Sequence, residues 1–464
     1  MQELFHIGAK GESLMTDLTY THPTSNSYAL YELAKQVIPG GVQGNIKYYD
    51  PYPLSFASAK GAWLKDVDDH DYVDYLLSFG ALILGHGHSV VKQAVEEVWD
   101  TYGTSSFGVP YPLELTMGKK IKSLYPSIQQ VRFTNSGLEA TLLAIRLGMA
   151  YTEKSSIAKF AGHYHGGHEQ VLVSTQPIIN DGTHPRQVSE SRGLPDYYLD
   201  HTIVLPFNDT ETSERILREN QDRIGVVILE PLQSGYIPAN PQFLQHLRRV
   251  TKELGMVLIF DEVKTGFRVR LGGAQELYDI QPDLTSLGKV LGGGFPIGAV
   301  GGRKDILEMT APRPNAPHDV VFHSGTFNGN PMSLLSGLRT IEFLQDGDHY
   351  GMLLKMTENL RQEVERLGKR YGLPIKTVGE GSIFNLVFVN EQEGNGARPW
   401  DIVAAEQSAD HRRLRGQLDF LLMEHGVFSK PYNRFSLSLA HDEKAIQHTL
   451  DAFEKSFAAL IKRG

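Results

Sequence analysis

A lysine in front of a glycine-rich stretch is the first candidate for chemistry in this chain. Lys289 lies in DLTSLGKVLGGGFPIGAVGG. A lysine that condenses with an aldehyde must be desolvated and must lose its proton, and glycines let the backbone approach a flat ring closely. An ordinary surface lysine is one alternative and a nucleotide-binding P-loop is another. The P-loop interpretation fails because Val290 stands where the magnesium-binding hydroxyl would be.

Two continuous apolar runs end on a carboxylate. They are GVVILE, which ends at Glu230, and MVLIFD, which ends at Asp261. Such runs are typical of strands in a parallel sheet covered on both faces, and open sheets of this kind bind ligands at the carboxyl ends of their strands. A buried carboxylate needs a partner, and a protonated pyridine nitrogen would suit Asp261. The carboxylate would keep that nitrogen charged and the ring a strong electron sink.

A candidate phosphate site lies in VRFTNSGLEATLLAIRLGMAYT. VRF predicts a short strand, Asn135-Ser136-Gly137 predicts a turn, and a helix is expected from Glu139 onward. Free backbone N–H groups and the positive end of the helix dipole can bind phosphate at such a helix start. A plain helix cap accounts for the same residues, so both interpretations stay open at this stage.

Three histidines stand close together in FAGHYHGGHE. They are His163, His165 and His168, and their spacing matches no common zinc pattern. The chain has no cysteine, which excludes disulfides, thiolate nucleophiles and cysteine-ligated zinc. We therefore predict no metal site, and Tyr164 is better interpreted as a flat ring that stacks on an aromatic cofactor.

The elements that must position these residues alternate between strands and helices. PQFLQHLRRVTKELG has helical spacing of its apolar residues and ends at Gly255, so it predicts the helix of a strand–helix–strand unit. Long amphipathic helices then alternate with short strands such as IFNLVFV and FSLSL. We expect an α/β fold with a mostly parallel sheet and a smaller α+β domain. The predicted division is an N-terminal arm with short strands and turns at 1–75, a large domain at 76–330 and a small domain at 331–464.

The polar segment from Gln170 to His201 is long for a loop inside a domain. Either an active-site cover or a variable surface insertion explains it equally well.

Composition narrows the class of protein. The chain has 464 residues, 41% hydrophobic and 21% charged, with a formal net charge of -9. These values fit a globular enzyme and make a general nucleic-acid or anionic-membrane surface unexpected. The start of the chain lacks the apolar core of a signal peptide, and no apolar run approaches the roughly 20 residues of a membrane span. We expect a cytoplasmic protein.

Almost the whole chain, from about Pro39, resembles the class III, fold-type I aminotransferases that depend on pyridoxal 5′-phosphate. It is most similar to the glutamate-1-semialdehyde 2,1-aminomutase and β-amino-acid aminotransferase subgroups. The specific motifs, in this order, are LEP, FDEVKTGFRV, PDLTSLGKVLGGGFPIGAVGGR and HSGTFNGNP, and PGG, LILGHGH, VRFTNSGLEA and YHG match as well.

The resemblance implies roles for the residues around the cofactor ring. Lys289 would form the Schiff base and then move a proton between substrate and cofactor, while Asp261 would pair with the pyridine nitrogen. Val263 and Tyr164 would pack on opposite ring faces, and Glu230 in LEP is counted among the cofactor-binding residues.

It also implies a phosphate site and a dimer. Ser136, Gly137 and the backbone of Leu138 would hold the phosphate, and Thr326 would reach the phosphate of a neighbouring subunit in a homodimer. Leu138 replaces a frequent threonine and Lys264 replaces a frequent glutamine or methionine near the phenolic oxygen of the cofactor. Lys264 would either donate to that oxygen or point away from it.

On the substrate side the chain matches neither subgroup. Phe79 replaces a tryptophan of the aminomutases, Gly44 and Lys47 stand at serine and arginine positions, and KPYNRFSLS lacks an expected acid. Tyr432 replaces an arginine of the β-phenylalanine type. Lys47 and Arg434 are the remaining nearby cations that could take a substrate carboxylate.

We expect an aminotransferase that moves an amino group between a small-molecule amine donor and a carbonyl acceptor, with pyridoxamine 5′-phosphate as the intermediate cofactor form. The first alternative is intramolecular transfer of the aminomutase type. A catalytically idle cofactor-binding protein is the second alternative, against which Lys289 and Asp261 argue.

Overall fold

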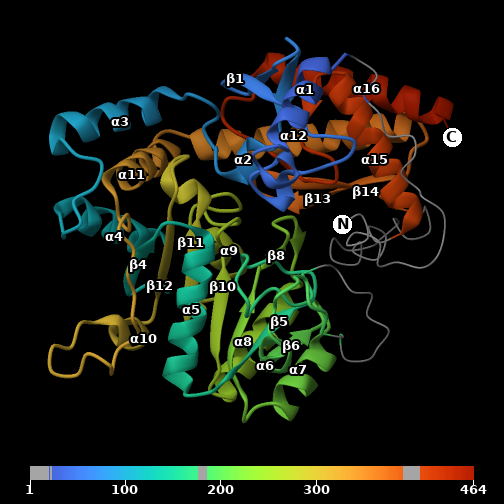
Figure 1. The fold of residues 1–464 in the computed structure, drawn as a ribbon. Coiled ribbons are helices and arrows are strands. Elements are labelled where there is room, and N and C mark those ends of the chain that lie inside the picture. Colours follow the sequence, from blue (N-terminus) through green and yellow to red (C-terminus); the bar gives the residue numbers. More distant parts are fainter. Residues whose placement is uncertain (1–19, 21–22, 176–184, 186, 390–407, 464) are drawn as a thin grey trace.

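A seven-stranded sheet forms the centre of the computed structural model, which describes residues 20, 23–175, 185, 187–389 and 408–463 (Figure 1). Strand β12 runs antiparallel to both of its neighbours, β11 and β4, and the other paired strands are parallel. The strands, in spatial order, are β4 (Gln130–Thr134), β12 (Gly298–Gly302), β11 (Leu284–Gly288), β10 (Val257–Asp261), β7 (Ile224–Leu229), β5 (Ser156–Phe160) and β6 (Thr202–Leu205). The predicted mostly parallel sheet is confirmed.

Helices cover both faces of this sheet, which explains the continuous apolar runs. Alternate residues of β7 and β10, such as Val226 and Ile259, pack with α5 (Gly137–Thr152). The residues between them, such as Val227 and Phe260, pack with α7 (Thr210–Glu219) and α8 (Pro241–Glu253) on the other face. The predicted helix between the two strands is thus confirmed as α8, and Gly255 with φ 66° follows its end. Further helices before residue 311 include α3 (Ser89–Tyr102), α4 (Pro112–Leu124), α6 (Asp196–His201), α9 (Gly273–Tyr278) and α10 (Lys304–Leu307).

The C-terminal part mixes long helices with small sheets, as expected. Its helices are α11 (Pro331–Gln345), α12 (His349–Arg370), α15 (Ala409–Glu424) and α16 (Glu443–Arg463). One sheet has the order β13 (Ile375–Glu380), β14 (Ile383–Phe388), β16 (Phe435–Ser436). A four-stranded sheet has the order β1 (Phe56–Lys60), β2 (Trp63–Asp66), β3 (Asp71–Asp74), β15 (Val427–Phe428), so it joins the two ends of the chain. The domain division at residues 75 and 330 stays a prediction.

The N-terminal segment contains a helix that the sequence analysis did not expect. Residues Ser25–Ala34 form α1, where only short strands and turns were predicted. The Asp68 carboxylate accepts hydrogen bonds from the first-turn N–H groups of Asn26 (2.8 Å) and Ser27 (2.9 Å). The cap thus comes from some 40 residues further along the chain, and the side chain of the N-cap residue Thr24 makes no cap hydrogen bond.

The polar segment after Gln170 is anchored to the sheet at its start. The buried Lys159 ammonium donates to the carbonyls of Val173 (2.6 Å) and Ser174 (3.3 Å). Residues 176–184 and 186 lie outside the described residues. Whether the segment covers the active site therefore stays a prediction.

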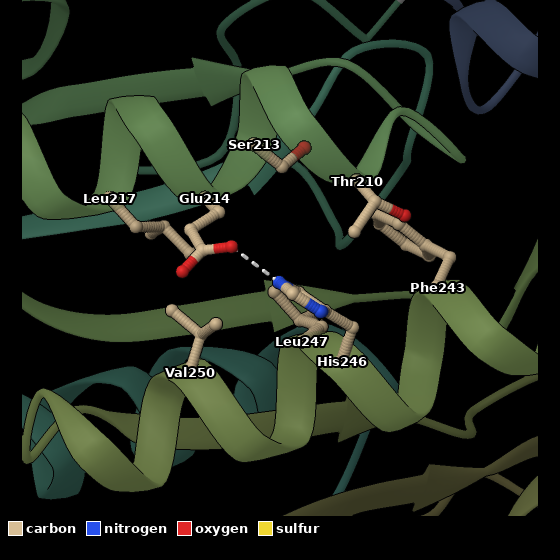
Figure 2. A pocket seen from close by; sticks show the side chains of 8 residues that line it. All are labelled: Thr210, Ser213, Glu214, Leu217, Phe243, His246, Leu247 and Val250. Carbon is tan, nitrogen blue, oxygen red and sulfur yellow. Dashed lines mark hydrogen bonds and ion pairs between the residues drawn. The ribbon is translucent and has the colours of Figure 1, made fainter.

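A small pocket of about 10 Å³ lies between α7 and α8 (Figure 2). Its polar feature is a 2.6 Å contact between Glu214 Oε2 and His246 Nε2. None of the predicted site residues lines it, so this pocket belongs to helix packing. Within the described part of the chain, no helix is both long and apolar enough to cross a membrane.

Asp283, buried just before β11, links the strands that carry the site. Its carboxylate accepts from Arg248 (2.7 and 3.1 Å), from Arg303 (3.2 Å) and from the Leu258 N–H (2.9 Å). Burial raises the pKa of Asp283, but the hydrogen bonds from Arg248 and Leu258 outweigh it, so the pKa lies below its usual value. A lowered folded-state pKa stabilises the fold above the pKa of the unfolded chain and loses this effect as the pH falls.

We therefore expect Asp283→Asn to lower the free energy of unfolding by about 2 kcal/mol at neutral pH. The difference from the wild type should shrink as the pH falls below about 4. Denaturant unfolding at a series of pH values measures it, with Asp100→Asn on the exposed face of α3 as the control. A pH-independent difference would contradict the assigned ion pairs.

Candidate active site

Five chemically distinct residues meet at the carboxyl edge of the central sheet. Asp261 ends β10, Lys289 follows β11 on one side of it, and Glu230 follows β7 on the other. Ser136 follows β4, and Tyr164 lies four residues after β5. The site is therefore built at the edge where open parallel sheets bind ligands.

Lys289 is held in an unusual backbone conformation. It has φ 49°, in the left-handed region, and opens a short 3-10 helix (Lys289–Gly292) directly after β11. Non-glycine residues in this region are uncommon and are held there by their surroundings. Burial lowers the pKa of the Lys289 ammonium; Asp261 and Glu230 oppose this shift, and Arg268 adds to it. A lowered pKa favours the neutral amine that attacks an aldehyde.

The Asp261 carboxylate has one charged or polar side-chain partner within the described residues. Asp261 is 5% exposed, and its Oδ2 lies 2.8 Å from His165 Nδ1. Its Oδ1 accepts from the Val263 N–H at 3.0 Å. His165 is buried, and its Nε2 has no hydrogen-bond partner among the described residues. Sequence reasoning missed His165, because it treated the histidine only as a candidate metal ligand.

The first turn of α5 lies where the phosphate cup is predicted. The N-cap Ser136 Oγ accepts from the Glu139 N–H (3.2 Å), and Glu139 Oε2 accepts from the N–H of Asn135, one residue before the N-cap (2.8 Å). The first intrahelical bond joins the Ala140 N–H to the Ser136 carbonyl. The N–H groups of Gly137 and Leu138 precede that bond and can therefore bind an anion.

Val263 lies between this cup and the strand end that carries Lys289. A Cβ on Gly137 would lie 2.5 Å from Val263 Cγ1, and a Cβ on Gly288 would lie 3.2 Å from the same atom. Glycine at both positions makes room for the valine. The contacts bring together the cup, one predicted ring-packing residue and the backbone before the lysine.

The Glu230 carboxylate fixes the backbone on the other side of the site. It accepts from the N–H groups of Tyr164 (3.0 Å) and Ser234 (3.3 Å). Burial raises the pKa of Glu230, and Asp261 raises it further, while His165, the Tyr164 N–H and Arg434 lower it. The Tyr164 ring itself is 52% exposed and thus accessible for stacking.

The three histidines of this segment have three different partners. His163 Nδ1 accepts from the Glu230 N–H (3.0 Å), His165 contacts Asp261, and His168 Nε2 lies 3.4 Å from Thr141 Oγ1. Burial lowers the pKa of His163 well below its usual range and that of His168 to about 4. One ring nitrogen of each histidine thus contacts a group of the protein, and the other has no partner among the described residues.

Two other predicted cofactor residues are placed without a direct link to Lys289. Lys264 is buried, and its stem fills the space beside Gly235, whose Cβ would lie 2.6 Å from Lys264 Cδ. Thr326 is exposed in the single chain. It lies two residues before Asn328, whose Oδ1 accepts from Asn135 Nδ2 beside the cup (2.8 Å). Their roles toward the cofactor stay predictions.

Among the predicted substrate residues, Phe79 lies in the most strained segment. Leu77, Ser78 and Phe79 have φ of 47°, 53° and 56° in α2 (Leu77–Gly80). Asp74 Oδ1 stabilises this turn by accepting from the Leu76 (2.8 Å) and Leu77 (3.1 Å) N–H groups. Consecutive left-handed residues of this kind cluster at functional sites.

The charge of Glu230 acts on Arg434, whereas Lys47 is an exposed side chain. The Nε of Arg434 is buried and has no hydrogen-bond partner among the described residues. Burial lowers the pKa of Arg434, against the effects of Glu230 and Tyr236. Lys47 is exposed in a short 3-10 helix (Asn45–Lys47), and Tyr432 is 44% exposed.

A buried ion pair fixes the segment that carries Arg434. Arg415 Nε lies 2.9 Å from Asp419 Oδ1 on α15, and both side chains are buried. Asp419 Oδ2 accepts from the Tyr432 N–H (2.7 Å), and Arg415 donates to the Asn433 carbonyl. The ion pair therefore orients the backbone on which Arg434 stands.

Comparison with known proteins agrees with this geometry. Residues 46–416 match the family described as aminotransferase class-III. The chain belongs to the class III aminotransferases. Membership confirms the expected fold type, the aminotransferase or aminomutase chemistry and the dependence on pyridoxal 5′-phosphate.

Relatives and solved structures of this family cover nearly the whole chain. A glutamate-1-semialdehyde 2,1-aminomutase of Methanosarcina acetivorans is 37% identical over 92% of this chain and 97% of its own. An omega-transaminase of Sphaerobacter thermophilus is 34% identical, with a TM-score of 0.88 over 96% of this chain and 99% of its own. A β-phenylalanine aminotransferase of Variovorax paradoxus is 31% identical, with a TM-score of 0.80 over 94% of each chain.

The residues present fit the cofactor of the family. The N–H groups of Gly137 and Leu138 suit its phosphate, and the buried Asp261 suits its ring nitrogen. Lys289 lies at the neighbouring strand end with a lowered pKa, as a lysine that binds an aldehyde requires.

Replacing Gly137 tests the cup. In Gly137→Ala the new methyl group would lie 2.5 Å from Val263 Cγ1 and displace it. We expect the dissociation constant for pyridoxal 5′-phosphate to rise by about tenfold or more, equivalent to about 1.4 kcal/mol. Equilibrium dialysis of the purified protein measures it.

The matched control is Gly167→Ala. Its methyl group would make an ordinary contact of 3.8 Å with Leu138 Cδ1. Equal cofactor affinity in the two variants would contradict the assignment of the cup.

Proposed function

We propose that this protein is an aminotransferase that moves an amino group between a carboxylate-bearing amine donor and a separate carbonyl acceptor. The observation that carries this proposal is Arg434, a cation beside Glu230 whose buried Nε has no partner among the described residues. A substrate carboxylate would supply the charge-assisted hydrogen bonds that this guanidinium lacks.

The side chains at the sheet edge have different roles in the proposed reaction. When bound, pyridoxal 5′-phosphate withdraws electrons from the substrate carbon and so acidifies its proton. The Lys289 amine, once free, takes that proton and returns it one atom further along. Asp261, oriented by His165 at 2.8 Å, holds the ring nitrogen charged.

The residues around Arg434 suit it for binding a carboxylate. The buried Arg415–Asp419 pair fixes the two residues before it, so the guanidinium is placed by a rigid neighbour. The Glu230 carboxylate already accepts from two backbone N–H groups. Its negative charge favours the charged form of Arg434, although no ion pair within 4 Å joins the two side chains in the described part of the chain.

Intramolecular transfer of the aminomutase type is the second candidate. It is favoured by the 37% identity to an aminomutase over 97% of that protein's length. The chemistry at Lys289 and Asp261 is common to both reactions, so the two differ in whether the carbonyl half-product leaves the site.

Incubation of the purified holoenzyme without any acceptor separates the two candidates. We would add α-amino acids, β-amino acids and glutamate-1-semialdehyde separately and identify the products by mass spectrometry. An aminotransferase releases one carbonyl product per Lys289 and then stops. Repeated conversion of the semialdehyde to 5-aminolevulinate without an outside donor would overturn the proposal, and Lys289→Ala is the control for uncatalysed conversion.

Replacing Arg434 tests the carboxylate site. We expect Arg434→Ala to raise KM for a carboxylate-bearing donor by about 10- to 100-fold, from the loss of one charge-assisted contact of about 1.5–3 kcal/mol. KM for an amine without a carboxylate should not rise. Arg434→Lys should fall between the wild type and the alanine variant, because a point charge replaces a planar fork.

Lys47→Ala is the matched control, since Lys47 is the other cation considered and is exposed. A raised KM in Lys47→Ala alone would assign the carboxylate to Lys47. Unchanged kinetics in both variants would exclude both cations.

We further propose a cytoplasmic homodimer in which Thr326 completes the phosphate site of the partner subunit. Support comes from the exposure of Thr326 and of its neighbour Phe327, which is 60% exposed in the single chain. A second copy would cover these side chains.

Mixed dimers test this arrangement. Thr326→Val should weaken cofactor binding, because one hydroxyl contact to the phosphate is lost. Mixed dimers with Lys289→Ala should regain wild-type cofactor affinity in about half of the sites, since each intact lysine then meets an intact threonine from the other chain. Titration with cofactor measures the fraction, and no recovery would place Thr326 in its own subunit's site.

A further inference from the structure

Arg268 is a buried guanidinium without a carboxylate partner among the described residues. Its side chain is 0% exposed. Nε donates to the Gly80 carbonyl (2.7 Å), and Nη1 donates to Ser382 Oγ (3.1 Å) and to the Leu437 carbonyl (2.8 Å). Within the described part of the chain Nη2 has no hydrogen-bond partner.

Burying such a group is unfavourable. An ionised group removed from water costs several kcal/mol unless an opposite charge compensates it. Neutral carbonyl and hydroxyl oxygens satisfy only part of the guanidinium, and an apolar side chain of similar size would fill the space without that cost. The position of Arg268 therefore calls for a role beyond packing.

The three hydrogen bonds join parts of the chain that are far apart in sequence. Gly80 ends the strained turn that carries Phe79, while Ser382 precedes β14 and Leu437 follows β16. Leu437 lies three residues after Arg434. The guanidinium thus links both predicted substrate elements to the loop that follows Asp261.

The backbone of Arg268 makes the same connection. Its carbonyl accepts from the Ser382 N–H at 3.0 Å. A Cβ on the adjacent Gly381, which has φ 62°, would lie 2.2 Å from that carbonyl oxygen. Only glycine allows this approach, so the junction is held by both the main chain and the side chain.

Both ends of the junction also contact the segment around Lys289. A Cβ on Gly266, two residues before Arg268, would lie 3.1 Å from Leu287 Cδ2 on β11. Leu82, just after the Phe79 turn, has its Cδ2 2.9 Å from where a Cβ on Gly294 would stand. Lys289 lies between these two contacts in the chain.

The charges that act on Lys289 include this guanidinium. Asp261 and Glu230 favour the protonated amine, and the positive charge of Arg268 opposes it. Burial lowers the pKa of Arg268, and the Tyr350 hydroxyl, which has no hydrogen-bond partner among the described residues, raises it. The charge of Arg268 also contributes to lowering the pKa of the buried His441. A neighbouring cation is one known means of keeping a nucleophilic lysine neutral.

We propose that Arg268 is a positioning residue with two effects. It holds the Phe79 turn and the Arg434 segment in place against each other, and it supplies an uncompensated positive charge near Lys289. The first effect rests on the proposed function, because it assumes that Phe79 and Arg434 face the substrate, whereas the second requires only the cofactor.

Three variants separate the two effects. Arg268→Gln removes both the charge and the planar guanidinium with its several donors. Arg268→Lys keeps a charge but not the planar guanidinium, and Ser382→Ala removes one hydrogen-bond acceptor. The first measurement is the visible absorbance of each holoenzyme between pH 5 and 10 without substrate, which reports the protonation of the lysine nitrogen bound to the cofactor. The second is KM and kcat for the best donor.

We expect Arg268→Gln to raise the pH midpoint of the absorbance change by about one unit, because a like charge no longer disfavours the protonated nitrogen. Arg268→Lys should keep the wild-type midpoint. Arg268→Lys and Ser382→Ala should raise KM by about three- to tenfold, from the loss of one hydrogen bond, with little change in kcat.

Arg248→Gln is the matched control. Arg248 pairs with Asp283 and so contributes to stability, but it lies outside the site. Its loss should lower the melting temperature and leave the pH midpoint unchanged.

A wild-type midpoint in Arg268→Gln, or equal shifts in the glutamine and lysine variants, would overturn the electrostatic effect. If Arg268→Gln does not fold, Arg268→Lys and Ser382→Ala decide the matter, and wild-type KM in both overturns the proposal. Because the titration uses no substrate, its failure is distinguishable from a wrong assignment of the donor.

Discussion

The buried carboxylate of Asp261 is the constraint on which the rest of the site depends. It is 5% exposed at the end of the central strand β10, where an unpaired charge would be costly. His165 and the Val263 N–H stabilise it from the protein side. A protonated ring nitrogen of the family's cofactor would be a further partner for this carboxylate.

The same constraint explains the pattern of glycines. A flat ring bound beside Asp261 would require the cup, Val263 and the lysine backbone to lie close to one another. Gly137 and Gly288 allow this, since a Cβ at either position would lie 2.5 or 3.2 Å from Val263. These glycines, which in the sequence indicate a turn or loop, are thus positions where the backbone approaches Val263 closely. The left-handed φ of Lys289 belongs to the same compact arrangement.

Sequence reasoning predicted the parts whose signals are local. Continuous apolar runs predicted β7 and β10, a helical spacing predicted α8, and the Asn-Ser-Gly turn predicted the start of α5. It missed His165 as the partner of Asp261, because the two are separated by 96 positions and only the sheet brings them together. Helix α1 was missed for the same reason, since its cap is the distant Asp68. Arg268 looks in sequence like any arginine after a turn, and only the fold reveals that it is buried.

The residues proposed for the chemistry have local sequence signals, whereas those proposed for substrate specificity depend on long-range contacts. Asp261 ends a strand of the central sheet, and Lys289, Ser136 and Glu230 follow other strands of it, so these residues come together wherever that sheet forms. The substrate side depends instead on contacts between distant segments, such as Arg415 with Asn433 and Arg268 with Gly80. Small changes in those contacts can alter the pocket while the sheet edge stays intact. An aminomutase and an omega-transaminase can therefore both resemble this chain over nearly its whole length. We therefore expect the junction of the Phe79 turn, the Arg434 segment and the loop after Asp261 to determine which of the two reactions this protein catalyses.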